Sequence, residues 1–104
     1  MATAFDVLAQ PIRRSILDRL RERAWLVGEL AETLDITQPL ASKHLRVLRD
    51  AGLVTVRVDG PRRWYGLRAE PLVAVDDWLA PYRRMWDSSL DALERHLDSM
   101  EEST

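Results

Sequence analysis

The sequence contains no cysteine among its 104 residues, which excludes disulfide bonds and thiolate metal ligands. It also has only two histidines and four glycines. This composition leaves no glycine-rich phosphate-binding loop and no set of nucleophile, base and metal ligand of the kind that catalysis needs. We therefore expect a protein that is not an enzyme and that carries no cofactor.

Long apolar runs are also missing. No stretch approaches the roughly 20 apolar residues of a membrane span, and residues 1–6 lack the basic and apolar segments of a secretory signal. We expect a cytoplasmic protein with no membrane partner. With 46% hydrophobic and 31% charged residues, residues 1–104 have the composition of one globular domain.

Charge is distributed unevenly along the chain. Residues 1–68 carry 12 lysines and arginines against 8 aspartates and glutamates, whereas residues 69–104 carry 3 against 9. The basic excess is greatest within residues 38–68, where 7 basic residues face 2 acidic ones. Such a concentration of positive charge indicates a surface for a polyanion, although charge alone would also fit an ordinary solvated face.

Three short helices are expected before residue 52. Pro11 opens the first, which runs to Leu20, because proline has no N–H to lose in the first turn of a helix. The second spans 27–34, and the third runs from Gln38 to about Ala51 and ends at Gly52. The tight turn at residues 35–37 makes the second and third helices a helix-turn-helix pair.

A β-hairpin follows this pair. Residues 53–58 alternate and are rich in β-branched side chains, Asp59 and Gly60 supply a turn, and residues 63–68 return as the second strand. The fold class that we expect is therefore mainly α with a small β-hairpin, a winged helix-turn-helix. Residues 11–68 form the head of this fold.

The chain from Pro71 to about Met100 is expected to be helical, with a kink or a break at Pro81. Its apolar stripe is longer than the small head can cover, which indicates a dimer interface. We expect dimerisation through this helix, residues 71–100. The interface residues predicted on it are Leu79, Tyr82, Trp86, Leu90, Leu93 and Leu97.

The third helix and the hairpin carry the predicted function. An exposed helix face fits the major groove of DNA, and a basic hairpin beside it reaches phosphates or the minor groove. The helix buries Ala41, Leu45 and Leu48, so its polar side chains face outward; His44 lies beside the buried stripe and has a structural or a phosphate-contacting role. The predicted DNA-binding residues are Gln38, Pro39, Ser42, Lys43, His44, Arg46, Arg57, Arg62 and Arg63.

The run from Gln38 to Val54, QPLASKHLRVLRDAGLV, together with residues 8–14 and 27–31, strongly resembles the ArsR family of bacterial regulators. The resemblance extends through the Trp64-Tyr65 hairpin and residues 78–86 to nearly the whole chain. It implies a winged-helix homodimer built through the N- and C-terminal helices, residues 1–10 and 71–100, which adds Phe5 and Leu8 to the predicted interface. It also implies binding to double-stranded operator DNA, usually as a repressor that a signal releases.

This sequence departs from the family at its metal site. Related metal sensors carry cysteines in the helix that here spans 27–31, or Asp, His and Glu ligands on the terminal helix, and neither set is present. His96 has no second histidine at ligand spacing, so no metal is expected. Leu26 replaces a Ser or Thr helix cap, which predicts a compensating contact nearby, for example from Trp25.

Two alternatives remain open at this stage. A winged helix also serves as a protein-interaction module, although the polar and basic face of Gln38, Ser42, Lys43 and Arg46 argues against that use. The aromatic residues Trp78, Tyr82 and Trp86 form either dimer core or a small-molecule pocket. The sequence does not reveal whether a small-molecule or protein effector acts on the regulator.

Overall fold

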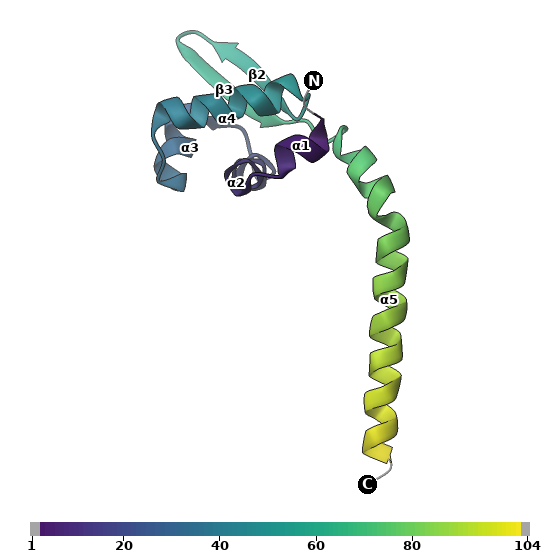
Figure 1. Cartoon of the computed structure of the whole chain (residues 1–104). Coiled ribbons are helices and arrows are strands. Elements are labelled where there is room, and N and C mark those ends of the chain that lie inside the picture. Colours follow the sequence, from purple (N-terminus) through teal and green to yellow (C-terminus); the bar gives the residue numbers. More distant parts are fainter. Residues whose placement is uncertain (1–2, 103–104) are drawn as a thin grey trace.

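The computed structural model describes residues 3–102, so residues 1 and 2 of the expected N-terminal dimerisation segment lie outside it. Its elements, in chain order, are α1 (Ala4–Leu8), α2 (Pro11–Leu20), β1 (Trp25–Leu26), α3 (Val27–Leu34), α4 (Gln38–Asp50), β2 (Val54–Asp59), β3 (Arg62–Leu67) and α5 (Leu72–Glu102). The fold is a winged helix-turn-helix followed by a long helix, which confirms the predicted fold class (Figure 1). None of the described helices has the length and hydrophobicity to span a membrane.

The wing belongs to a three-stranded antiparallel sheet with the order β1-β3-β2. The hairpin register runs from Val54 opposite Leu67 to Asp59 opposite Arg62. β1 pairs Trp25 with Tyr65 on the other side of β3. The sequence predicted the hairpin but not β1, because a two-residue strand is too short to show an alternating pattern. β1 ties the wing to the segment that enters α3.

Local chemistry fixes the ends of the helix-turn-helix. α4 begins where the hydroxyl of Thr37 accepts a hydrogen bond from the backbone N–H of Leu40 (3.3 Å). It ends before Gly52, whose φ of 79° lies in the left-handed region that glycine adopts without strain. The turn between α3 and α4 passes through Asp35, also at positive φ (54°). These features hold the two helices at a sharp angle.

The residue just before α3 is Leu26, whose side chain cannot cap a helix. Glu29 stabilises this helix start through a different amide: its carboxylate accepts a hydrogen bond from the backbone N–H of Leu26 (2.9 Å). This bond and the nearby Arg23 guanidinium lower the pKa of Glu29. The expectation that Trp25 would compensate is therefore wrong, because its indole N–H donates instead to the carbonyl of Arg19 (2.9 Å).

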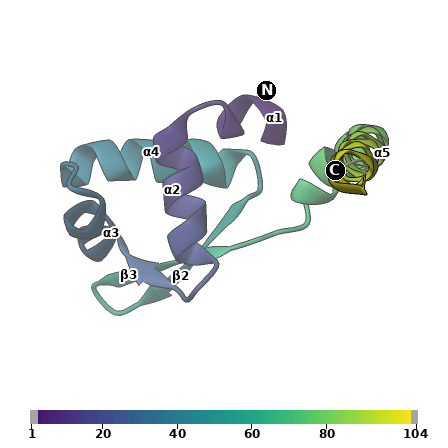
Figure 2. The same cartoon turned by 90° about the horizontal axis from the view of Figure 1, so that it is seen from below.

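The core of the head lies between α2, α3, α4 and the sheet. Its largest fully buried side chains come from α1, α2, α3, α4 and the residue just before β2, and the helices cross over one another on one side of the sheet (Figure 2). They are Val7, Ile16, Leu30, Leu45, Leu48 and Leu53. Because one face of each helix packs into this core, the opposite face is exposed to solvent.

α5 leaves the head as a long arm (Figure 1). The molecule measures 69 × 28 × 20 Å, and its radius of gyration is 19.5 Å, whereas a compact domain of this length has about 13 Å. The base of the arm is attached to α1, where the ring of Phe5 meets Trp78 edge-on at 6.0 Å and Trp78 packs on Tyr82 at 4.9 Å.

Pro81 does not divide α5 into two helices. The helix is continuous from Leu72 to Glu102, so the alternative of a break is wrong. Its axis changes direction in the first third, the part that includes Pro81 (Figure 1). Proline has no N–H to donate to the carbonyl of Asp77, but Asp77 and Pro81 are exposed residues, so the lost hydrogen bond does not leave a polar group in a buried core and the helix continues.

The positive φ of Gly52 generates a stability prediction. Gly52→Ala places a Cβ on a left-handed residue, which should lower the free energy of unfolding by about 1 kcal/mol in urea denaturation. Gly28→Ala in α3 is the matched control, because its Cβ would lie 3.8 Å from the nearest atom of another residue. It should leave stability unchanged or raised. Equal effects of the two substitutions would contradict this account of the helix end.

Candidate nucleic-acid interface

The exposed face of α4 follows from its buried face. Ala41, Leu45 and Leu48 are buried at the steps of three and four residues that return to one side of a helix. Ser42 and Arg46, four residues apart, lie on the exposed side. The structure therefore places these two predicted DNA contacts together on the surface of the recognition helix.

A groove of about 420 Å³ separates α4 from the wing. The lining residues from the two elements are Ser42, Leu45, Arg46, Arg49, Arg63 and Tyr65. Three guanidinium groups and no carboxylate line it, so its charge suits an anionic ligand such as the DNA backbone. The groove joins a predicted helix contact, Arg46, to a predicted wing contact, Arg63.

Two lining residues, Arg49 and Tyr65, were not among the residues predicted from the sequence. Arg49 lies three residues after Arg46 and is exposed on the same side of α4, so helical spacing was a signal that could have identified it. Tyr65 is half-buried between the groove and β1, and only the strand register brings it there. Sequence spacing alone carried no signal for its position.

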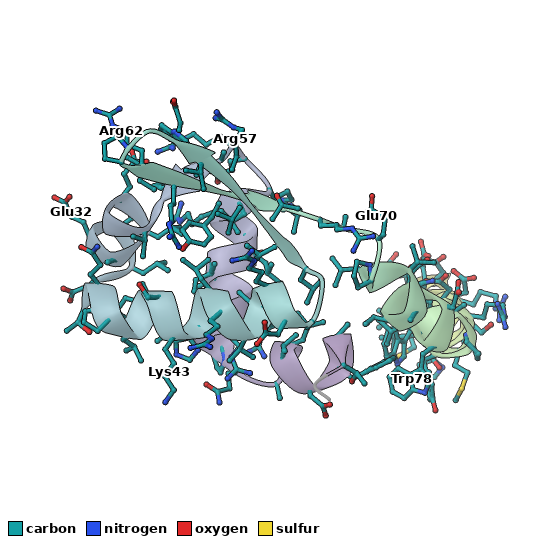
Figure 3. All side chains as sticks on the ribbon, turned by 90° about the horizontal axis from the view of Figure 1, so that it is seen from above. Glu32, Lys43, Arg57, Arg62, Glu70 and Trp78 are labelled. Carbon is teal, nitrogen blue, oxygen red and sulfur yellow. The ribbon has the colours of Figure 1, made fainter. Side chains whose placement is uncertain are left out.

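The other predicted contacts of α4 lie around this groove. Gln38 and Pro39 are exposed in the first turn of the helix. The amide oxygen of Gln38 lies 3.8 Å from where a Cβ on Gly28 would be, so this side chain sits beside the start of α3. Lys43 is exposed but points away from the wing, on the other side of α4 (Figure 3). It lies outside the groove itself.

The wing carries two further exposed arginines. Arg57 and Arg62 point outward from the hairpin, away from α4 (Figure 3). Arg57 lies opposite Trp64 in the strand register, with its guanidinium carbon 6.0 Å from the centre of the indole ring. These side chains extend the positive surface from the groove to the tip of the hairpin.

His44 is not on this surface. Its side chain is buried, with 6% of its area exposed, and its Nδ1 accepts a hydrogen bond from Nε of Arg13 (3.2 Å) on α2. Including His44 among the DNA contacts is therefore corrected: the imidazole links α2 to α4, which was the structural alternative.

The predicted interface residues fall into two groups. Phe5, Leu8, Leu79 and Tyr82 lie where α1 meets the base of the arm, whereas Trp86, Leu90, Leu93 and Leu97 lie on the projecting part of α5. Each of the latter four is more than half exposed. Of the predicted aromatic cluster, Trp78 and Tyr82 are in contact with each other. A recess of about 490 Å³ lies beside them on α5, lined by Pro81, Arg84, Met85, Ser88 and Ser89.

Residues 3–102 contain no cluster of three or more histidine, aspartate, glutamate or cysteine side chains placed to hold a metal ion. His96 lies exposed on the arm. The arrangement that the described residues do form is a basic groove between a helix and a hairpin.

A helix-turn-helix whose recognition helix is flanked by a basic wing defines the class of winged helix-turn-helix DNA-binding proteins. Residues 8–57 match the family model of a helix-turn-helix domain. The HTH-type transcriptional regulator Rv2034 of Mycobacterium tuberculosis is 38% identical over 97% of this chain and 92% of its own length. The transcriptional repressor SdpR of Bacillus subtilis is 29% identical over 86% of this chain and all of its own.

Solved structures that resemble this chain are also those of transcriptional regulators. The ArsR family transcriptional regulator RHA00566 is 37% identical, with a TM-score of 0.68 over 81% of this chain and 87% of that one. Mb0332 of Mycobacterium bovis, a possible ArsR-family regulator solved as a homodimeric winged helix-turn-helix DNA-binding domain, is 27% identical. It has a TM-score of 0.61 over 75% of this chain and 72% of that one. The chain belongs to the ArsR family of winged helix-turn-helix transcriptional regulators.

The buried His44 generates a prediction on pH. Burial, followed by the positive charges of Arg13 and Lys43, lowers its pKa below the ordinary 6.5. The unfolded chain then binds more protons than the folded one, so stability should fall as the pH drops through about 6.5. His44→Asn keeps an acceptor for Arg13 but cannot be protonated. Its free energy of unfolding should therefore decrease less between pH 7.5 and 5.5 than that of the unmodified protein.

Urea denaturation at the two pH values measures this difference. His96→Asn is the control, because that histidine is exposed on the arm, and it should retain the pH dependence of the unmodified protein. If His44→Asn lost as much stability on acidification as the unmodified protein, protonation of His44 would not be the cause.

Proposed function

We propose that this regulator is a homodimeric repressor that binds operator DNA through α4 and the wing. The observation that carries the proposal is the groove in which Arg46 and Arg49 of α4 face Arg63 of β3 without a carboxylate. A helix with polar and basic side chains on its exposed face fits the major groove of DNA, while the hairpin beside it reaches the adjacent DNA backbone. Residues 11–68 form the head that carries both parts.

Individual roles follow from the position of each side chain. Gln38, Ser42 and Arg46 lie at the start and on the exposed face of α4, where they reach base edges. Gln pairs with adenine and Arg with guanine in a bidentate manner. Pro39 packs beside them in the first turn. The remaining contacts, to phosphates, come from Lys43, Arg49, Arg57, Arg62 and Arg63.

The dimer is supported by the exposed apolar side chains of α1 and α5. A helix that projects into solvent with Trp86, Leu90, Leu93 and Leu97 more than half exposed leaves an apolar strip that a soluble monomer rarely carries. In the homodimer, residues 1–10 and 71–100 of the second copy would cover this strip. Two linked heads then reach half-sites about 34 Å apart, one turn of the duplex.

Repression is supported by the name of the relative SdpR, and the homodimer by that of Mb0332. A dimer that occupies an operator excludes other proteins from the same DNA. The protein itself carries out no chemical step in this function.

Fluorescence anisotropy tests the proposal by comparing binding of the protein to the DNA upstream of its own gene with binding to a scrambled duplex. Specific binding should weaken steeply as salt is added. For six phosphate contacts, the logarithm of the binding constant should fall against the logarithm of the salt concentration with a slope of about −5. A winged helix used as a protein-interaction module would bind neither duplex, and its contacts would not show this salt dependence.

Arg46→Ala should weaken operator binding by about 1–3 kcal/mol, because it removes a bidentate contact with a base. Arg49→Ala and Arg63→Ala should each make the salt slope shallower by about 1, as expected for lost phosphate contacts. Arg95→Ala is the control of equal charge change, since Arg95 lies exposed on the arm. If the groove variants bound like the control, the assigned surface would be wrong.

The dimer interface has its own prediction. Leu93→Glu combined with Leu97→Glu should give a monomer in sedimentation velocity, because charge would replace two side chains of the apolar strip. Ser88→Glu combined with Arg95→Glu adds glutamates to other positions of the same exposed segment and should remain dimeric. A dimer that survives the leucine substitutions would exclude this part of α5 from the interface.

A further inference from the structure

Arg13 of α2 is held in a different way from the other bonded arginines of the described chain. Four of those pair with carboxylates, and a fifth, Arg14, donates to the backbone carbonyl of Leu8 (2.6 Å). Arg13 instead donates from Nε to Nδ1 of His44 (3.2 Å). Its terminal nitrogens, Nη1 and Nη2, have neither a hydrogen-bond partner nor a carboxylate among residues 3–102. The guanidinium is therefore anchored at one end only and keeps its positive charge.

The surroundings of this pair are positively charged. Burial lowers the pKa of His44 first, and the positive charges of Arg13 and Lys43 lower it further. None of the ion pairs between described residues brings a carboxylate to either cation. Two like charges close together without a counterion repel each other, and an anion from outside the protein would remove this repulsion. The junction of α2 and α4 therefore suits an anionic partner.

This junction lies on the opposite flank of α4 from the wing. Successive residues of an α-helix are about 100° apart, since a turn has 3.6 residues. Around the helix from the groove, Arg46 is therefore followed by Lys43 and then by His44, which faces α2. The hairpin lies on one side of α4 and Lys43 points to the other (Figure 3). Arg13 is half-buried, so part of its side chain reaches solvent on this second flank.

A recognition helix in DNA needs cations on both of its flanks. The major groove is about 12 Å wide, and a helix inside it lies between the phosphates of two strands. Arg49 and Arg63 line the groove beside the wing, where they face one of these strands. The second strand would run along the flank that carries Lys43 and Arg13. The two terminal nitrogens of Arg13 form the planar fork that binds phosphate oxygens in pairs.

We propose that Arg13 is a further DNA-binding residue, which contacts a phosphate on the flank of α4 opposite the wing, and that His44 positions it. The proposal rests on the operator binding of the proposed function and adds a contact from α2. His44 acts through Arg13 and does not itself touch DNA. Because the bond at Nε orients the guanidinium before DNA arrives, the side chain loses less conformational entropy on binding.

Arg13→Gln tests the contact, because the carboxamide N–H can still donate to His44 but carries no charge. Operator binding should weaken about tenfold for each head on the duplex, and the salt slope should become shallower by about 1 for each. A phosphate contact reads no sequence, so binding to the scrambled duplex should weaken by the same factor. Arg95→Gln, the same change of charge on the exposed arm, is the control.

Three results of this experiment would overturn the proposal. One is an Arg13→Gln variant that binds both duplexes as tightly as Arg95→Gln does. Another is a loss of affinity with an unchanged salt slope, which would indicate a tie between α2 and α4 without a phosphate contact. The third is a loss confined to the operator. If the chain without substitutions shows no preference for the operator, the proposed function itself is wrong.

A double-mutant cycle tests the positioning role of His44. His44→Leu fills the buried site with an apolar side chain of similar size and removes the acceptor for Nε of Arg13. It should weaken DNA binding several-fold in the presence of Arg13 and cause no further loss when combined with Arg13→Gln. A general effect on the structure of α4 would instead weaken both backgrounds equally. Additive losses would therefore refute the positioning role.

Chemical modification provides a measurement that requires no substitution. Phenylglyoxal reacts with guanidinium groups, and mass spectrometry of the digested protein locates each product. Operator DNA should slow the reaction of Arg13 and leave that of Arg95 on the arm unchanged. Equal reaction rates of Arg13 with and without DNA would overturn the proposal, even if Arg13→Gln failed to fold.

Discussion

The arrangement of the interface depends on the burial of one face of α4. Ala41, Leu45 and Leu48 must be covered by the head, since an apolar side chain of leucine size gains about 1.5–3 kcal/mol on burial. A helix has a rigid angular spacing, so this burial determines that Ser42 and Arg46 face solvent on the side of the wing. Packing of the apolar face of α4 therefore also orients its polar face, and the polar side chains need no further contacts to face solvent.

The same constraint explains which features could be predicted from the sequence. Helix bounds, the hairpin and the groove residues of α4 follow from local periodicity and from prolines and glycines at helix ends. Those signals place α2, α3 and α4 correctly. Tertiary pairing decided the rest. β1 exists because Trp25 lies opposite Tyr65, and Tyr65 lines the groove because its pairing with β1 and β2 places it there. Neither pairing leaves a trace in local sequence.

His44 and Pro81 show where single-residue expectations fail. A histidine between a lysine and a leucine on a basic helix has the same local sequence context whether it faces phosphate or Arg13, and its angle relative to the core decides between the two. Pro81 would be costly in a helix that is packed on all sides, but here it lies on an exposed part of α5. In both cases the deciding quantity is exposure, which the fold determines.

β1 has a further consequence for the thermodynamics of binding. With β3 held between β2 and the segment that leads into α3, the wing cannot swing independently of the helix-turn-helix. The groove therefore exists before any ligand arrives, and the backbone loses little conformational entropy when DNA enters it. In such a preformed groove, the spacing between α4 and the wing is already set before DNA binds. It favours duplexes whose local shape already matches its spacing over those that must deform to fit.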